Sequence, residues 1–252
     1  MLETVPLDRA LPREEYKTRI SYLRSRLFDI QKTCWEHGVG SLVVFEGWDA
    51  AGKGSAIGAL TRQLEPRGFR LHAIQQPRSH EAELPWLWRF WNLLPARGEM
   101  AIFDQSWYGR VFRDRVAGAV SEREWLDAYG AICEFERTLA DDGYVLIKFF
   151  LHIGKAEQAK RLRRLRGDPL GSWQLTTDVW KRHRTYGDHL IAAEEFLERT
   201  ETEWGPWTIV EATDRRWARF RVFDTVTTAL EGALRERNVP LPAWQPTGHA
   251  EE

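Results

Sequence analysis

A glycine-rich segment, residues 47–54 (GWDAAGKG), has residue types and spacing suited to binding a phosphate group. It matches the pattern G-x-x-x-x-G-K, in which backbone N–H groups surround a phosphate at a helix N-terminus and the lysine reaches its outer oxygens. The segment follows the apolar run 41–46 and precedes a helical pattern, the context that such a loop requires, although a structural turn is the alternative. The predicted phosphate-binding residues of the loop are Gly47, Ala50, Ala51, Gly52, Lys53, Gly54 and Ser55.

Two carboxylates could hold a metal ion beside that phosphate. Asp49 lies within the loop, where its charge would repel a phosphate unless a metal ion or a proton lies between them. Asp104 ends the apolar run 100–104, a position from which strand-end carboxylates hold magnesium. We predict that both bind Mg²⁺ and that, with Lys53, they are catalytic. A helix-capping role for Asp49 and a structural role for Asp104 are the alternatives.

Basic side chains gather in two stretches. Arg110, Arg113 and Arg115 follow Asp104 closely, and residues 155–166 are rich in lysine and arginine. Guanidinium groups neutralise the charge that develops on a transferring phosphoryl group, and a row of them suits a long polyanion. We predict phosphate contacts for Arg115 and for Arg161 in the second stretch. A solvated helix face is the alternative for residues 155–166.

Three tryptophans lie close together at Trp86, Trp88 and Trp91. Their rings could stack on a nucleobase, but aromatic residues at helical spacing are more often part of a core or an interface. The spacing favours the core, and base stacking is the alternative.

Composition limits the class of protein. The chain has 252 residues, of which 43% are hydrophobic, and 36 Lys and Arg nearly balance 37 Asp and Glu. This balance argues against nonspecific nucleic-acid binding and against attachment to a membrane surface. Cys34 and Cys133 lack the spacing of a zinc site or a disulfide framework, so we expect small buried residues in a reducing compartment. Without an apolar N-terminal stretch, a cytoplasmic location is the simplest interpretation.

Apolar runs alternate with helical patterns along the chain, which predicts a parallel sheet flanked by helices. The expected strands are 41–46, 69–74, 100–104, 144–151 and 208–212. The expected helices are 14–37, 53–65, 84–93, 155–166, 177–199 and 216–238. We divide the chain into an N-terminal helical segment (1–40), a core that contains the phosphate loop (41–238) and a loose tail (239–252).

Taken together, these motifs resemble the polyphosphate kinase 2 family in order over about residues 14–235. The segments that carry the resemblance are 45–54 (FEGWDAAGKG), 64–68 (LEPRG), 94–99 (LPARGE), 103–110 (FDQSWYGR), 148–153 (KFFLHI), 168–169 (DP), Trp173 and 204–207 (WGPW).

The resemblance implies an α/β fold of the P-loop NTPase type, similar to thymidylate kinase, with a basic helical lid at about 154–185. It implies Mg²⁺-dependent transfer between inorganic polyphosphate and an adenine or guanine nucleotide. Asp49 and Asp104 would position metal and phosphate, Lys53 would contact the phosphates, and Arg110 would be catalytic on the phosphate path. Family members commonly form homodimers or homotetramers, so an oligomer is expected.

Two residues depart from the family pattern. Gln105 stands where the family usually has arginine after the strand-end aspartate, and Trp48 stands where the loop usually has arginine. Glutamine can donate a hydrogen bond but cannot neutralise charge, and a lost charge-assisted contact costs about 1.5 to 3 kcal/mol. A slower or differently selective enzyme, or a domain that binds without turnover, would be the consequence.

Three functions therefore compete. The first is phosphorylation of AMP, or of ADP, from polyphosphate, and the tryptophan-rich segment 85–91 resembles the AMP-phosphorylating branch. The second is an ATP-dependent nucleoside monophosphate kinase, against which Gly54 argues because that position usually holds the Ser or Thr that binds magnesium. The third is a non-catalytic module that binds polyphosphate or nucleotide, which Gln105 supports. The retained Asp49, Lys53 and Asp104 favour activity.

Overall fold

A parallel sheet of five strands forms the centre of the molecule, in the order β2-β3-β1-β4-β5. The computed structural model describes residues 1–169 and 175–243. The strands are β1 (Ser41–Gly47), β2 (Phe69–Ala73), β3 (Met100–Asp104), β4 (Val145–His152) and β5 (Trp207–Glu211). The three central strands are almost wholly buried, as expected for apolar strands covered on both faces. The predicted α/β fold is confirmed.

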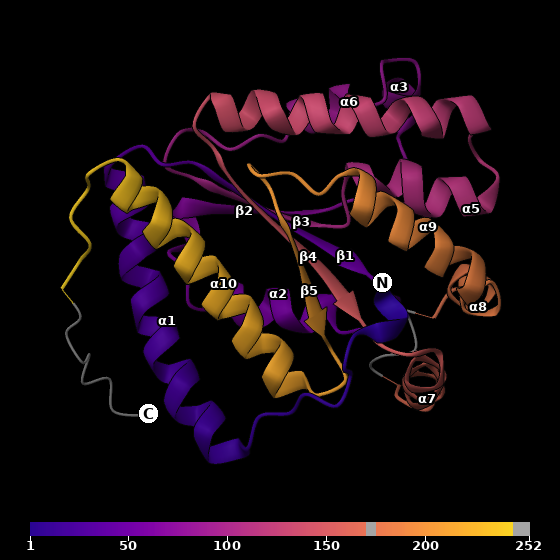
Figure 1. Cartoon of the computed structure of the whole chain (residues 1–252), viewed down its shortest axis with the longest axis horizontal. Coiled ribbons are helices and arrows are strands. Elements are labelled where there is room, and N and C mark those ends of the chain that lie inside the picture. Colours follow the sequence, from indigo (N-terminus) through magenta and orange to yellow (C-terminus); the bar gives the residue numbers. More distant parts are fainter. Residues whose placement is uncertain (170–174, 244–252) are drawn as a thin grey trace.

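Helices cover both faces of this sheet (Figure 1). On one face, α10 (Arg215–Glu236) lies beside α1 (Arg13–Glu36) and contacts α2 (Lys53–Thr61) and β4. The other face carries α6 (Glu122–Asp141) and α9 (Tyr186–Arg199), which pack on the segment that follows β3. Apolar residues of α1 belong to the same core cluster as the strands, and the helix packs chiefly against α10.

The remaining described helices lie near the sheet's carboxyl edge or in the connections to it. They are α3 (Ser79–Ala82), α4 (Trp88–Trp91), α5 (Arg115–Ala117), α7 (Lys155–Arg166), α8 (Thr177–Arg184), short 3-10 turns at 2–4, 66–68 and 107–109, and a π-helical turn at 110–114. Helices α7 and α8 lie beyond the ends of β4 and β5 (Figure 1). They occupy the region that the resemblance assigns to a lid.

Several helix predictions were wrong in extent. The stretch 84–93 is not one helix, because Trp88 N donates to Pro85 O and Phe90 N to Leu87 O, bonds of tight turns that leave only the short α4. The predicted helix 53–65 ends at Thr61, before the extended Glu65 that precedes Pro66.

The predicted helix 177–199 is divided into α8 and α9 at Thr185. The Thr185 hydroxyl donates to the carbonyl oxygens of Lys181 (3.2 Å) and Arg182 (3.4 Å), a local bond that competes with helix geometry.

Helix α6 has no counterpart among the predicted elements. Its sequence carried a usable signal, because Ser121 and Glu124 form a capping box at its start.

Of the residues that carried the family resemblance, Trp173 lies outside the described residues, as do residues 244–252 of the predicted tail. Across residues 1–169 and 175–243, every helix is too short or too polar to span a bilayer.

Candidate functional site

The glycine-rich loop joins β1 to α2 at the carboxyl edge of the sheet. Gly47 has φ +126°, and a Cβ there would collide with the carbonyl oxygen of Leu151 on β4, so only glycine fits. Gly52 caps α2 with φ +107°. The Lys53 ammonium is buried and donates to Gly47 O (3.0 Å) and Trp48 O (3.1 Å). Two N–H groups of the loop also have protein partners, because Trp48 N donates to Leu151 O (3.2 Å) and Ala51 N donates to Trp48 O (3.2 Å).

Arg161 of α7 binds carbonyl oxygens of the loop. Its Nη1 donates to Ala50 O (3.1 Å) and Ala51 O (3.0 Å), and its Nη2 donates to the carbonyl oxygens of Ala212 (2.8 Å) and Thr213 (2.9 Å). Its Nε donates to Glu157 (2.8 Å), so five acceptors match the five N–H groups of the guanidinium. These contacts do not support the predicted phosphate contact of Arg161; they support a role in fixing the loop's carbonyl groups.

Trp48 is the second anchor of the loop. The residue is 3% exposed, and its ring stacks on Tyr186 of α9 at 4.3 Å between centroids, while Nε1 donates to His152 Nδ1 (2.7 Å). Where the family pattern has a cation, this chain therefore places a core residue that joins the loop to α9 and to the end of β4.

Asp49 forms an ion pair with Arg182 of α8, at 2.6 Å between Oδ2 and Nε. Burial by itself raises the pKa of Asp49, but the positive charges of Lys53 and Arg182 outweigh it and hold that pKa below its ordinary value. Sequence analysis did not single out Arg182, although the basic run 181–184 (KRHR) was a signal for it. The pair joins the loop to the helix that the resemblance assigns to the lid.

We expect Arg182→Gln to loosen α8. A pair this exposed contributes about 1 kcal/mol, which corresponds to roughly fivefold faster hydrogen exchange of the α8 amides. Because the pKa of Asp49 is lowered in the folded protein, the contribution is complete above pH 3.8 and is lost as the pH falls through the lowered pKa.

Hydrogen exchange by mass spectrometry checks this, with exposed Arg184→Gln on the same helix as the control. An NMR titration should also show a higher pKa for Asp49 in Arg182→Gln. Unchanged exchange of α8 in that variant would contradict the pairing.

The β3 end brings Asp104 beside the loop, because Phe45 of β1 and Asp104 of β3 are paired residues of neighbouring parallel strands. Gln105 follows with φ +66°, and its backbone N–H donates to Phe45 O (3.0 Å).

Over residues 1–169 and 175–243, His, Cys, Asp and Glu form no group of three suited to a metal. One or two carboxylates suffice for Mg²⁺ when phosphate and water supply the remaining oxygens, and Asp49 and Asp104 are the carboxylates predicted for that role.

Two cavities meet at this position. A narrow one lies over the loop and is lined by residues that include Asp49, Lys53 and Arg182. The other, of about 110 Å³, lies between the end of β2, the tryptophan segment and the residues after β3. Their linings share Gln105 and Arg113 and are otherwise different. The arrangement provides two adjoining compartments, one of them at the phosphate loop.

Arg110 and Trp86 form one wall of the larger cavity. The Arg110 guanidinium lies 5.4 Å from the centroid of the Trp86 ring and forms an ion pair with Glu124 at 2.9 Å. Trp88 and Trp91 are 38% and 44% exposed, so the favoured assignment of all three tryptophans to the core is wrong for these two. Short turns, in place of a continuous helix, leave their rings at the surface.

Two other predicted phosphate ligands already have protein partners. Arg115 forms an ion pair with Glu195 (2.7 Å), donates to Tyr129 Oη (3.1 Å) and lies 3.8 Å from the Trp125 ring centroid. It does not line either cavity at the loop. Ser55 accepts a hydrogen bond from Arg219 Nη2 (2.8 Å).

Cys34 is buried as predicted, whereas Cys133, which lies on α6 facing the end of α9, is only partly buried.

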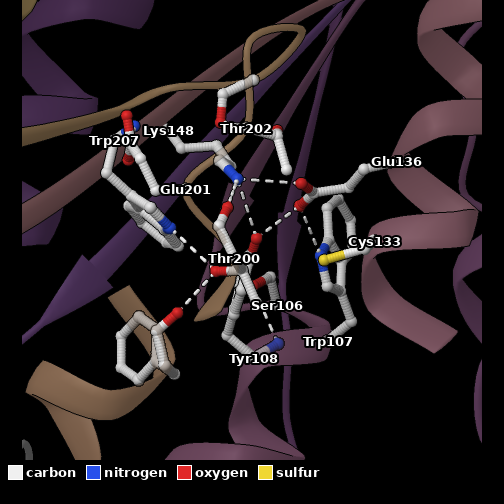
Figure 2. A network of polar contacts seen from close by, with 12 residues as sticks. Ser106, Trp107, Tyr108, Cys133, Glu136, Lys148, Thr200, Glu201, Thr202 and Trp207 are labelled. Carbon is white, nitrogen blue, oxygen red and sulfur yellow. Dashed lines mark hydrogen bonds and ion pairs between the residues drawn. The ribbon is translucent and has the colours of Figure 1, made fainter. Parts of the chain in front are cut away.

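A buried polar network holds the segment that follows Asp104 (Figure 2). Glu136 of α6 and Lys148 of β4 pair at 2.8 Å, and both side chains are fully buried. Glu136 also accepts from Trp107 Nε1 (3.0 Å) and Tyr108 Oη (2.6 Å), and Lys148 donates to Thr200 O (2.9 Å). Burial and the Glu136 carboxylate raise the pKa of Tyr108, so its hydroxyl remains a donor. This network fixes Tyr108 and also Trp107, which lines the larger cavity.

A glycine loop between a buried strand and a helix, with a strand-end aspartate on the neighbouring strand, defines a P-loop kinase-like fold. The family model described as polyphosphate kinase 2 (PPK2) matches residues 10–238. The chain belongs to the polyphosphate kinase 2 family.

Comparison with individual proteins agrees with this assignment. A polyphosphate:AMP phosphotransferase of Pseudomonas syringae pv. tomato is 39% identical over 93% of this chain, and a GDP-polyphosphate phosphotransferase of Mycolicibacterium smegmatis is 34% identical over 86%. The matches cover 47% and 77% of those proteins. A crystal structure of polyphosphate kinase 2 from Arthrobacter aurescens TC1 has TM-score 0.90 and 28% identity, covering 97% of this chain and 88% of that one. The chain thus spans about half the length of the first of these relatives.

Proposed function

We propose that this protein transfers a phosphoryl group from inorganic polyphosphate to a nucleotide, with AMP as the first candidate acceptor and ADP as the second. The observation that carries the proposal is the pair of adjoining cavities, one over the phosphate loop and one against Trp86 and Arg110. A donor phosphate in the first and an acceptor phosphate in the second would meet beside Gln105 and Arg113. The name of the Pseudomonas syringae relative supports AMP.

The chemistry needs positioning and charge more than proton transfer. An oxygen of the acceptor phosphate attacks the terminal phosphorus of polyphosphate, and the bond from that phosphorus to the bridging oxygen breaks. The shortened polyphosphate leaves with the bonding electron pair, and AMP becomes ADP. The attacking oxygen is mostly ionised at neutral pH, since a phosphate monoester has its second pKa near 6. The task of the protein is then to hold both anions in line and to neutralise their charge.

Mg²⁺ would supply part of that neutralisation when bound, and Asp49 and Asp104 are the side chains proposed to hold it. Lys53 is proposed to turn from the carbonyls of Gly47 and Trp48 toward the donor phosphates. Helices α7 and α8, within the segment 154–185, are proposed as the lid. The Asp49–Arg182 pair would hold it closed.

A third cavity, of about 460 Å³, offers a path for the donor chain. It adjoins Ala50 of the loop, and its lining includes the cations Lys160, Arg161, Arg164 and Arg215, together with Glu157 and Asp214. Burial, followed by the positive charges of Arg161 and Arg164, lowers the pKa of Arg215, although Glu157 acts in the opposite direction. A polyphosphate chain would relieve this repulsion.

The test is nucleotide formation by the purified protein with Mg²⁺ and long-chain polyphosphate, supplying AMP, ADP and GMP in separate reactions. We expect ADP from AMP, no product without polyphosphate, and loss of product in Lys53→Ala. Product formation only with ATP as donor would identify a nucleoside monophosphate kinase instead. Polyphosphate binding with no turnover under any condition would identify the binding module that Gln105 suggested.

The assembly and location of the protein remain predictions. We propose a homodimer or homotetramer, which light scattering of the purified protein would test. A cytoplasmic location remains the simplest interpretation of the composition.

A further inference from the structure

Position 105 lies where donor and acceptor phosphates would meet, but it carries no charge. Gln105 lines both cavities, and its left-handed backbone is held by the bond from its N–H to Phe45 O. A transferring phosphoryl group spreads negative charge over its oxygens, and a neutral side chain supplies no positive charge to balance it at this point.

Arg113 is the other residue that lines both cavities. It lies one turn after Gly109 on the π-helical turn 110–114, and its side chain is 20% exposed. A Cβ at Gly109 would lie 2.8 Å from Arg113 Nη2, so the absence of a side chain at Gly109 makes room for the guanidinium. Arg113 therefore places a positive charge in the cavity wall that it shares with the neutral Gln105.

Glu46 holds Arg113 in this place. The carboxylate is fully buried near the end of β1, accepts from Ser106 N (2.8 Å) and Oγ (2.9 Å) through Oε1, and pairs with Arg113 Nη1 (3.1 Å) through Oε2. Among the described residues, Glu46 is the one acidic partner recorded for Arg113, and the contact uses Nη1 alone. Arg113 also lines the cavity over the loop together with Asp49 and Lys53.

The neighbouring arginines are held elsewhere. Arg110 pairs with Glu124 and lines only the larger of these two cavities, and Arg115 pairs with Glu195 and lines neither. Of the arginines at 110–115, Arg113 is therefore the one placed to act on both sides of the transfer.

We propose that Arg113 supplies the positive charge that stabilises the transferring phosphoryl group, in place of a cation at position 105. The proposal rests on the proposed function. Its rival is that Arg113 serves only as the counter-ion of buried Glu46. These two explanations predict different values of kcat when the ion pair is replaced by a neutral hydrogen-bonding pair. If Arg113 is only a counter-ion, it is not needed once the Glu46 carboxylate is gone.

The experiment compares the wild type, Arg113→Gln, the double variant Glu46→Gln/Arg113→Gln, and that double variant with Gln105→Arg added. For each protein, kcat and KM for AMP with polyphosphate are measured, together with the thermal unfolding midpoint. We expect Arg113→Gln to lower kcat about 100-fold. The neutral pair should regain most of the thermal stability but not kcat, and adding Gln105→Arg should raise kcat at least tenfold.

Near-wild-type kcat in the neutral-pair variant would overturn the proposal in favour of the counter-ion. Failure of Gln105→Arg to raise kcat would overturn the exchange of one position for the other. Both results leave polyphosphate-dependent turnover by the wild type intact. A wild-type protein without turnover would instead overturn the proposed function, and this inference with it.

Discussion

Replacement of Lys53 by alanine should lower kcat for polyphosphate-dependent nucleotide formation about 1000-fold, the upper part of the range for losing one preorganised donor at a transition state. The residue Lys53 is 9% exposed, and its ammonium is the cation within the glycine loop itself, where the low-dielectric surroundings strengthen its attraction for a phosphate. Its present partners are two backbone carbonyls, which it can exchange for phosphate oxygens.

The control for this variant is Lys17→Ala on α1, whose exposed side chain pairs only with Glu14 among the described residues. We expect its kcat to remain within about twofold of wild type, because a surface pair contributes little. Unfolding midpoints of both variants separate loss of chemistry from loss of fold. A Lys53→Ala protein that is folded and retains more than a tenth of wild-type kcat would contradict the role of the loop.

Replacement of Lys148 by methionine should lower the free energy of unfolding by about 3 to 5 kcal/mol, because it leaves the Glu136 carboxylate buried without its cation. Lys148 uses its three donors on Glu136, Tyr108 Oη (3.0 Å) and Thr200 O (2.9 Å), so methionine at this position removes all three hydrogen bonds. Urea unfolding measures the effect.

A double-mutant cycle tests whether the pair, and not the packing, is responsible. Lys148→Met combined with Glu136→Gln should cost less than the sum of the two single changes, since the second change removes the unpaired charge created by the first. Glu136→Gln keeps an amide oxygen that can accept from Trp107 and Tyr108 (Figure 2). Additive costs, or a loss below about 1 kcal/mol for Lys148→Met, would contradict the ion pair's contribution.

Much of the fold could be predicted because its signals are local. Apolar runs identified all five strands, and the order of strand, glycine loop and helix identified the phosphate loop. Helix ends were less well predicted, because they depend on side-chain bonds such as that of Thr185 to Lys181 O. Helix α6 was not predicted, although the capping box of Ser121 and Glu124 at its start is a local signal in the sequence.

The sequence by itself determined the class of site: a glycine-rich loop that begins at Gly47, a lysine six residues later, and an aspartate at the end of a later apolar run. These features are set by backbone geometry over a few residues, so they can be recognised without the tertiary structure.

Only the tertiary structure decided which cations face the loop. Arg161 donates to carbonyl oxygens of the loop. Arg182 pairs with Asp49, 133 positions away in the sequence. Arg113 pairs with Glu46, 67 positions away. An arginine side chain is long and can satisfy five acceptors in different directions, so its target depends on which carboxylates and carbonyls the fold brings within reach. Spacing along the chain cannot supply that information.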